Sequence, residues 1–421
     1  MNLNKIGSLA MATLMALASV TLLSIVPVSA SDDFTLGIYG NANQDDTIDM
    51  RDVTKIARMI CWLEDEVDLA DAKYDGNVNV LDIIQTELVI LGREKELTVL
   101  DSAGRTVTIP RPIERIVVFN SETVETMRSL RATEKIVGVG KYTIKDGIFF
   151  PEFADYPNVG SVWSPDYEGV VSCNPDLVFL YGTCSVSYCD EIQNKLEELD
   201  PAITVVRLDC YKPESYVREV AELGYILNHV SDADNFIRFY DGYMETIRDR
   251  VKDIPENERP EVYFEAWRPY HTAGSGSGWH EKVVYAGGKN IFDDLSGYPD
   301  VDQEEVVERD PEIIIRAAKD EGGYDTSDVS ELSEIWDEIM ARPELANVTA
   351  VQNQTVYIIA NPILGGVRHF IGIGYMAKWF YPDLFTDLDP ETAHREYLTE
   401  FQGLDESLVD NGVFVYPPQE S

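Results

Sequence analysis

From about residue 97 onward, short apolar runs rich in β-branched residues alternate with longer stretches in which apolar residues recur every three or four positions. Short runs of this kind, bounded by polar or turn residues, predict buried parallel strands, and the stretches between them predict helices. Seven runs stand out, at 115–119, 136–139, 177–181, 203–208, 262–266, 312–316 and 356–359. The alternation predicts an α/β fold with helices on the faces of the sheets.

One long helical stretch separates the first four runs from the last three. Its apolar residues form a single stripe: Phe236, Tyr240, Tyr243, Met244, Ile247, Val251 and Ile254. Ser231 is the expected N-cap, and Pro255 is the residue expected to end the helix. We therefore predict two Rossmann-like lobes, at 97–230 and 256–405, joined by one rigid helix over 231–255.

Both ends of the chain carry segments outside these lobes. Lys5 precedes an apolar run over 6–26, and small residues then stand at the −3 and −1 positions of a cleavage site after Ala30. This pattern predicts a signal peptide over 1–30 and therefore an exported protein. The last residues, 406–421, resemble a C-terminal tail.

An internal repeat lies between the signal peptide and the first lobe, in a predicted helical module over 34–95. Two twelve-residue segments, 41–52 and 71–82, place oxygen-bearing side chains at positions 1, 5, 9 and 12 and an apolar residue at position 8. A calcium loop needs this spacing, because alternate side chains point at one hard cation. The candidate calcium ligands are Asn41, Asn43, Asp45, Asp49, Asp52, Asp71, Asp75, Asn79 and Asp82.

A helical pattern follows each loop, and the whole module resembles a dockerin, a duplicated calcium-binding loop–helix fold that binds cohesin domains. The sequence departs from the dockerin pattern at Asp46, where glycine is preferred, and at Lys73, where an oxygen ligand is expected. The resemblance implies bound calcium and a cohesin-bearing partner. The alternative is a calcium-stapled spacer without a cohesin partner, since small modules often need a metal to fold.

Composition narrows the functional classes. The 421 residues carry a formal net charge of −41, from 34 Lys and Arg against 75 Asp and Glu. A field of that sign repels nucleic acid and anionic membrane surfaces, so we expect no nucleic-acid partner. The five cysteines include no CxxC pair, which argues against a zinc site, and a bridge between Cys184 and Cys189 is left open.

The candidate ligand-binding residues follow the predicted strands, because ligands of open α/β sheets lie beyond the carboxyl ends of the strands. Aromatic faces cover apolar chelates, and arginine forks hold anionic groups. Arg368 begins a helix after Gly365-Gly366, where a cation opposes the helix dipole, so we expect it to contact an anionic ligand group. The candidates are Asn120, Ser121, Trp163, Tyr181, Trp267, Arg268, His271, Arg316 and Arg368.

Short motifs in a characteristic order make the region 97–400 resemble the iron-complex, cobalamin and heme class of periplasmic solute-binding proteins. These motifs stand at 99–110, 112–117, 158–161, 174–178, 286–292, 310–315, 365–368 and 377–382. The resemblance implies a non-catalytic protein whose partner is an ABC importer, a permease dimer with its ATPase. It also implies that Glu168 and Glu304, one on each lobe, dock onto arginines of the permease.

Ligand identity is the least constrained prediction. A ferric siderophore is our first choice, because several cations are expected in the cleft, and cobalamin and heme stay open as alternatives. Two other functional classes are alternatives. An enzyme is disfavoured because the chain has no G-x-S-x-G elbow, HExxH helix or P-loop. A cell-surface scaffold, with the calcium module as its active end, is the second alternative.

Overall fold

The computed structural model describes residues 34–418 of the chain. The predicted signal peptide over 1–30 lies outside the described residues. Among the helices of the described part, none combines the length and the apolar character needed to cross a membrane.

The first lobe contains a four-stranded parallel sheet in the order β4-β3-β7-β8. Its strands are β3 (Ile116–Val118), β4 (Ile136–Val139), β7 (Leu177–Leu180) and β8 (Thr204–Arg207). The helices α4 (Ser121–Ser129), α5 (Lys141–Lys145), α6 (Tyr167–Ser172), α7 (Val186–Leu199) and α8 (Pro213–Leu227) follow these strands. All four predicted strands are confirmed to within two residues, because each is a buried apolar run with a clear polar boundary.

The second lobe contains a five-stranded sheet in the order β10-β9-β11-β12-β13, in which only β13 is antiparallel to its neighbour. Its strands are β9 (Glu261–Ala266), β10 (Lys289–Asn290), β11 (Ile313–Ala318), β12 (Val356–Ala360) and β13 (Val415–Tyr416). Its helices include α10 (Gly278–Tyr285), α11 (Gln303–Arg309), α12 (Ser330–Met340), α13 (Thr349–Asn353), α14 (Asn361–Leu364) and α15 (His369–Phe380). The three strands predicted for this lobe are confirmed.

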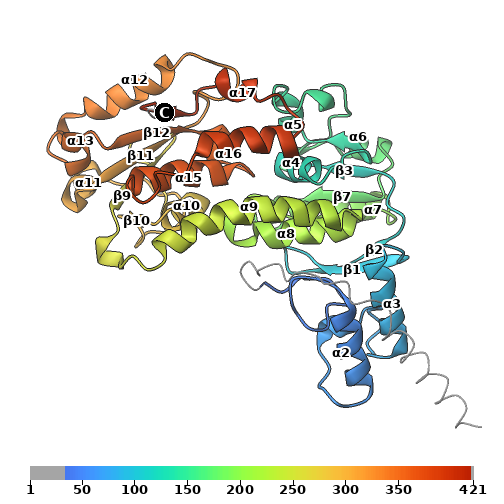
Figure 1. Cartoon of the computed structure of the whole chain (residues 1–421). Coiled ribbons are helices and arrows are strands. Elements are labelled where there is room, and N and C mark those ends of the chain that lie inside the picture. Colours follow the sequence, from blue (N-terminus) through green and yellow to red (C-terminus); the bar gives the residue numbers. More distant parts are fainter. Residues whose placement is uncertain (1–33, 419–421) are drawn as a thin grey trace, which may run out of the picture. The chain divides into compact units, whose positions relative to one another are not determined.

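A single long helix, α9 (Val230–Val251), runs from the first lobe to the second and lies beside α8 (Figure 1). The predicted N-cap is wrong: the helix is capped at His229, and Ser231 lies inside its first turn. Asn228 closes α8 in a left-handed conformation, with φ of 60°, so only Asn228 and His229 separate α8 from α9. The helix ends at Val251, before Pro255, and five residues of its predicted apolar stripe are buried, while Tyr243 and Ile254 are partly buried.

The C-terminal segment returns to the first lobe through α16 (Pro390–Glu396), the π-helical turn η5 (Tyr397–Phe401) and α17 (Ser407–Asp410). The Tyr397 hydroxyl donates to Glu125 Oε1 at 2.7 Å, and Gln402 Nε2 donates to Ser129 Oγ at 2.6 Å. The segment 406–421, predicted as a tail, contains regular structure. It includes α17, and β13 adds an edge strand to the second sheet.

The residues before the first lobe form α2 (Met50–Ile60), η1 (Asp68–Ala70) and α3 (Val80–Ile90), followed by the hairpin β1 (Glu96–Leu100) and β2 (Thr106–Pro110). Leu36, Ile38, Ile48 and Val89 belong to the same buried cluster as the core of the first lobe. The Tyr225 hydroxyl of α8 accepts a hydrogen bond from the backbone N–H of Ile48 at 2.8 Å. Apolar packing and a buried hydrogen bond thus join this segment to α8.

Candidate ligand-binding site

A cavity of about 340 Å³ lies where residues of both lobes meet, beyond the carboxyl ends of β3 and β12. This is the position at which open α/β sheets bind ligands. The first lobe contributes residues of α4 and of α5 with its C-cap, and the second contributes residues of α14 and of the turn between α14 and α15. The lining residues are Ser121, Glu122, Glu125, Tyr142, Lys145, Asp146, Asn361, Pro362, Gly365, Gly366 and Arg368.

Glu122 is the carboxylate held in the wall of this cavity by hydroxyl groups. Its Oε2 accepts from the Tyr181 hydroxyl at 2.9 Å and from Ser121 Oγ at 3.2 Å. Burial raises the pKa of Glu122, while the hydrogen bonds from Tyr181 and Ser121 oppose that rise. Ser121 and Tyr181 were predicted as ligand residues, and the structure places both beside Glu122, a residue that the sequence reasoning missed.

Arg368 lines the same cavity but is only 8 % exposed. Its Nε lies 3.1 Å from Glu125 Oε1, and its guanidinium carbon lies 3.8 Å from the centroid of the Phe149 ring. Glu125 and Phe149 belong to the first lobe and Arg368 to the second. The guanidinium therefore holds the two lobes together at the inner end of the cavity.

Asn120 and Trp163, the other two candidates in the first lobe, are not among the residues that line the cavity. Asn120 is buried, and its Nδ2 donates to Thr123 Oγ1 at 2.6 Å and to the Leu208 carbonyl at 3.2 Å. These bonds anchor the end of β3 to that of β8. Trp163 is 48 % exposed and its ring meets that of Tyr142, a lining residue, at 5.9 Å. Trp163 therefore extends the cavity wall outward through a tyrosine that the sequence reasoning missed.

Arg316 lies within the second lobe, in a buried ion-pair cluster. Its Nη1 is 3.1 Å from Glu265 Oε2, and Arg342 Nη1 is 2.7 Å from Glu265 Oε1. Glu265 is fully buried in β9. The sequence contains one indication of this cluster, because Glu265 interrupts the apolar run of 262–266.

A group of aromatic rings follows β9, in which the Trp267 ring is stacked on those of Tyr298 and His271 and meets the Trp279 ring edge-on. The Trp267 ring lies 4.5 Å from that of Trp279, 5.8 Å from Tyr298 and 6.0 Å from His271. Trp267 takes a left-handed backbone conformation, with φ of 49°, and its side chain is 39 % exposed. Bulky residues adopt that conformation only at an energetic cost that the surroundings must offset.

The two polar candidates in the same loop share one carboxylate. Arg268 Nη2 lies 2.7 Å from Asp300 Oδ1, and His271 Nδ1 lies 2.8 Å from the same oxygen. The loop after β9 therefore carries a partly exposed ring, that of Trp267, while the cation of Arg268 is already paired.

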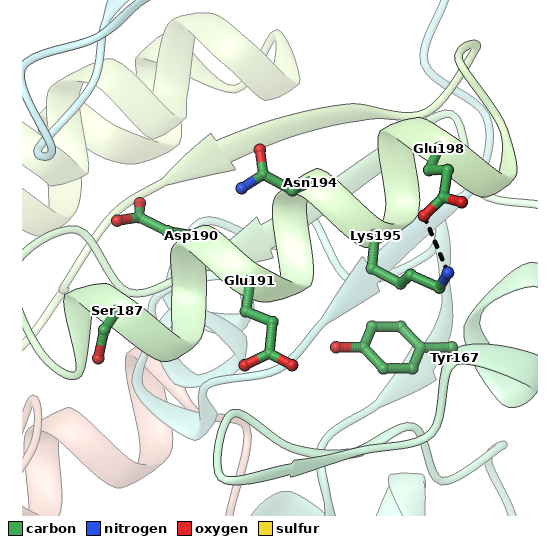
Figure 2. A pocket seen from close by; sticks show the side chains of 7 residues that line it. All are labelled: Tyr167, Ser187, Asp190, Glu191, Asn194, Lys195 and Glu198. Atoms are coloured by element: carbon green, nitrogen blue, oxygen red, sulfur yellow. Dashed lines mark hydrogen bonds and ion pairs between the residues drawn. The ribbon is translucent and has the colours of Figure 1, made fainter.

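The predicted permease-docking residues, Glu168 and Glu304, lie in the first turns of α6 and α11, and both are exposed. Beside Glu168, a surface groove of about 580 Å³ separates Tyr167 from one side of α7 (Figure 2). Glu191, Lys195 and Glu198 line the α7 side of the groove, and Lys195 Nζ pairs with Glu198 Oε2 at 2.9 Å.

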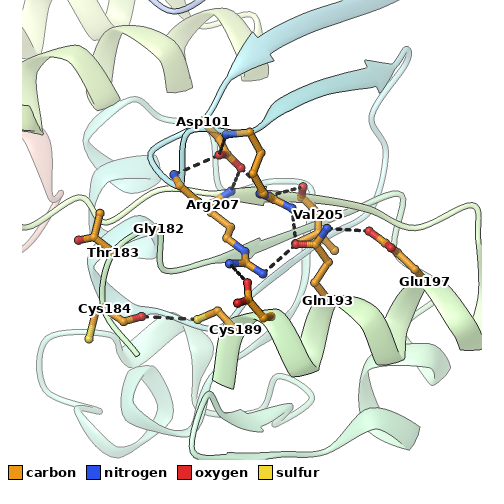
Figure 3. Close-up of polar contacts among 12 residues, drawn as sticks. Asp101, Gly182, Thr183, Cys184, Cys189, Gln193, Glu197, Val205 and Arg207 are labelled. Carbon is orange, nitrogen blue, oxygen red and sulfur yellow. Dashed lines mark hydrogen bonds and ion pairs between the residues drawn. The ribbon is translucent and has the colours of Figure 1, made fainter. Parts of the chain in front are cut away.

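The cysteines of the first lobe are all free thiols in this structure. Cys189 Sγ donates to the Cys184 carbonyl at 3.7 Å, beside the buried Arg207 (Figure 3). Arg207 pairs with Asp190 at 2.6 Å. Burial raises the pKa of the Cys189 thiol to about 11, so the thiol and not the reactive thiolate predominates at neutral pH.

The two predicted calcium loops have the same internal geometry. Asp52 accepts from the N–H groups of Asn43 and Asp49 at 2.9 and 2.8 Å, and Asp82 accepts from those of Lys73 and Asn79 at 2.9 and 2.7 Å. Each carboxylate oxygen still has a lone pair that a cation can use. The internal repeat inferred from the sequence is therefore a structural repeat.

The loops differ in how well their donor sets fit a calcium ion. In the first, Asn41 is fully buried, and its Oδ1 has no hydrogen-bond partner within the described part of the chain. In the second, the Lys73 ammonium pairs with Glu96 of β1, so the third loop position supplies no oxygen. Between residues 34 and 418, no three His, Cys, Asp or Glu side chains are grouped closely enough to hold a metal by themselves. In the first loop, the side-chain oxygens of Asn41 and Asn43 are therefore needed, beside the carboxylates, to make up a set of calcium ligands.

Comparisons with known proteins agree with this architecture. The family model described as "Periplasmic binding protein" matches residues 116–362, which is more than half of the chain. A cobalamin-binding protein of Halobacterium salinarum is 24 % identical over 275 residues, covering 64 % of this chain and 68 % of the relative. An uncharacterized ABC transporter substrate-binding lipoprotein of Bacillus subtilis, YvrC, is 24 % identical over 296 residues, covering 69 % and 87 %.

Among solved structures, the TroA-like periplasmic binding protein FepB from Veillonella parvula superposes with a TM-score of 0.65 at 25 % sequence identity. The similarity covers 76 % of this chain and 98 % of that protein. The two lobes, the connecting helix and the matched family model lead to one assignment: the chain belongs to the periplasmic binding protein family.

Proposed function

We propose that this protein is the exported solute-binding component of an ABC importer, which captures a small metal complex between its lobes and delivers it to a permease dimer with its ATPase. The observation that carries the proposal is the cavity at the strand ends, lined by residues from both lobes, in a member of the periplasmic binding protein family. The relatives named as a cobalamin-binding protein and as an ABC transporter substrate-binding lipoprotein support it.

The proposed ligand is a metal chelate, either a ferric siderophore, as the sequence reasoning favoured, or a corrinoid such as cobalamin. The exposed ring of Trp163, which contacts the lining residue Tyr142, suits the apolar face of such a complex. Capture and release need no bond making, so no catalytic role is proposed for any residue.

Glu168 and Glu304 are the proposed contacts to the permease. Each stands at the start of a surface helix on its own lobe, exposed to solvent. An exposed carboxylate can form a bidentate ion pair with an arginine of a partner protein. Replacing both by alanine is expected to abolish uptake in cells while ligand binding by the purified protein stays unchanged.

The segment 34–95 is proposed to bind calcium through its loops and a cohesin-like partner through its surface. The first loop carries the more complete donor set, since Asn41, Asn43, Asp45, Asp49 and Asp52 all supply oxygens. Large apolar side chains crowd the outside of the segment: Met50, Trp62, Leu63, Tyr74, Val80, Leu81, Ile84 and Leu91 are each about half exposed or more. Exposed apolar side chains of this kind often mark a surface that binds another protein.

Thermal unfolding with candidate ligands tests the central proposal. A ligand that binds only the folded protein raises the unfolding temperature in proportion to the logarithm of its concentration. We expect one metal complex to do so, with one molecule bound per chain by calorimetry. If no corrinoid, heme or ferric siderophore shifts the transition or produces heat, the proposal is wrong.

A further inference from the structure

The two predicted calcium loops differ in what their eighth residue contacts. In the first loop this residue is Ile48, which is 4 % exposed and belongs to the same buried cluster as the core of the first lobe. In the second loop it is Val78, which packs on a small cluster inside the N-terminal segment that includes Ile56 and Met59. The apolar residue of the first loop is therefore part of the lobe core, whereas that of the second stays within the segment.

The backbone of the first loop is also bonded to α8. The Tyr225 hydroxyl accepts from the Ile48 N–H at 2.8 Å and lies 3.3 Å from Thr47 Oγ1. Tyr225 is itself buried, so this contact is shielded from water. Because a buried N–H that loses its partner costs free energy, the conformation of the loop at 47–48 and the position of α8 are energetically linked.

Tyr225 lies in the last turn of α8, just before the connecting helix α9 begins. Its carbonyl accepts from Arg111 Nη2 at 2.8 Å, and Arg111 Nε lies 2.9 Å from Glu94 Oε1, at the other end of the N-terminal segment. Both side chains of that ion pair are buried. The segment thus holds the end of α8 at two points, one in the first calcium loop and one through Glu94.

The first loop also contains a buried oxygen that suits a cation. The Asn41 side chain is fully buried, and its Nδ2 donates to the carbonyls of Leu36 and Asp45 at 2.9 and 2.7 Å. Its Oδ1 has no hydrogen-bond partner between residues 34 and 418. A buried polar oxygen without a partner is costly, and a calcium ion in the loop would satisfy it. Leu36 belongs to the lobe core, so Asn41 connects this candidate ligand to the same core as Ile48.

We propose that calcium in the first loop orders the end of α8 and the start of α9 through Ile48 and Tyr225, so that the N-terminal segment is a calcium-dependent support of the first lobe. This inference rests on the calcium binding proposed above for the segment 34–95. The free energy of metal binding becomes folding free energy for the structure that the metal orders. By reciprocity, a change that separates Tyr225 from the loop must weaken calcium binding by the same factor. The second loop packs Val78 inside the segment, so calcium there should act only locally.

Hydrogen exchange of the purified exported protein, read by mass spectrometry in calcium chloride and in a chelator, tests the forward coupling. We expect calcium to slow exchange about fivefold or more at the backbone amides of 224–233, across the junction of α8 and α9, as well as in the first loop.

Two matched variants assign that effect to one loop. Asp45 and Asp75 occupy the fifth position of the first and second loops, and each accepts from the N–H two residues later at 3.1 Å. The slowing at 224–233 should be lost in Asp45→Ala and kept in Asp75→Ala. Because each variant is compared with itself in calcium and in chelator, loss of the loop hydrogen bond does not imitate loss of calcium.

Calorimetric titration of calcium measures the reverse coupling. In the Asp75→Ala background, which isolates the first loop, adding Tyr225→Phe should weaken calcium binding about fivefold or more. Tyr397→Phe is the control for a general loss of stability, because its hydroxyl also makes one buried hydrogen bond, to Glu125, in the C-terminal segment. It should leave calcium affinity unchanged.

The outcomes separate this inference from the calcium proposal on which it rests. Calcium that binds by calorimetry but slows exchange only within 34–95 overturns the inference and leaves calcium binding standing. Slowing at 224–233 that persists in Asp45→Ala, or an unchanged calcium affinity with Tyr225→Phe, also overturns it. If calcium produces neither heat nor any change in exchange, calcium binding itself is wrong, and the inference fails with it.

Discussion

The guanidinium of Arg368 in the second lobe lies 3.1 Å from the carboxylate of Glu125 in the first. The Tyr397 hydroxyl donates to the same Glu125 oxygen at 2.7 Å, and the Phe149 ring packs against the guanidinium. The sequence reasoning assigned Arg368 to the ligand, whereas its position makes it a contact between the lobes as well as a lining residue. The two roles predict different consequences of its removal.

Replacing Arg368 by alanine should destabilise the protein by about 3–5 kcal/mol, because Glu125 would be left buried and unpaired. The free energy of unfolding in urea measures this change. In the double variant Arg368→Met/Glu125→Gln, which removes both charges, most of the loss should be recovered. A single variant as stable as the unmodified protein would show that this pair does not hold the lobes together.

Glu222 of α8 predicts a pH dependence of stability. Burial raises its pKa to about 8, and Arg218, at 3.3 Å, only partly opposes that rise. Because the folded pKa lies above the ordinary value of 4.5, the folded state holds the proton more tightly than the unfolded state between those two pH values. Stability from this group is therefore greatest below pH 4.5, falls by up to about 1.4 kcal/mol per pH unit as the pH rises, and is constant above about 8.

In Glu222→Gln, the fall attributable to this residue should disappear. The measurement is the difference in unfolding free energy between variant and unmodified protein at pH 5, 6, 7 and 8, which should grow steadily across the series. Glu331→Gln, an exposed glutamate on α12, serves as the control and should show a constant difference. A difference for Glu222→Gln that does not change with pH would contradict the assignment.

Tyr225 joins the N-terminal segment to the first lobe. Its hydroxyl accepts from the Ile48 N–H at 2.8 Å and lies 3.3 Å from Thr47 Oγ1, both in the first predicted calcium loop. Tyr225→Phe leaves the Ile48 N–H buried without a partner and should cost about 1–3 kcal/mol. Hydrogen exchange at the Ile48 amide should accelerate, while Tyr39→Phe, which loses only a 3.5 Å contact to Thr106, should have little effect on it.

The second predicted calcium loop lacks an oxygen ligand because Lys73 stands at its third position and pairs with Glu96. Lys73→Asp supplies that oxygen and should increase calcium affinity at this loop, seen as a second, tighter binding event by calorimetry. Asp75→Ala in the same background should remove the gain. If neither the unmodified protein nor Lys73→Asp takes up calcium, the calcium proposal is wrong.

The strands were predictable because a buried parallel strand must be a short apolar run, and that pattern is local. The exact start of α9 was not predictable from a local pattern, because it depends on Asn228 closing α8 in a left-handed turn. The partners of the arginines were not predictable either. The register of β9 and β11 places Arg316 opposite Glu265, and Glu125 meets Arg368 from a different lobe.

The same limit explains the missed site residues. Glu122 and Tyr142 carry no motif of their own, and only the approach of α4 and α5 to the start of α15 places them in a cavity. Residue types at strand ends indicated where a ligand would lie. Which of the charges there remain unpaired is a property of the three-dimensional arrangement.

Native mass spectrometry of the exported protein, purified from its own host without denaturation, tests the capture function most directly. The account predicts one metal complex per chain that is lost when the protein is unfolded. A chain that carries no small molecule, and that acquires none when mixed with corrinoids, heme or ferric chelates, would contradict it.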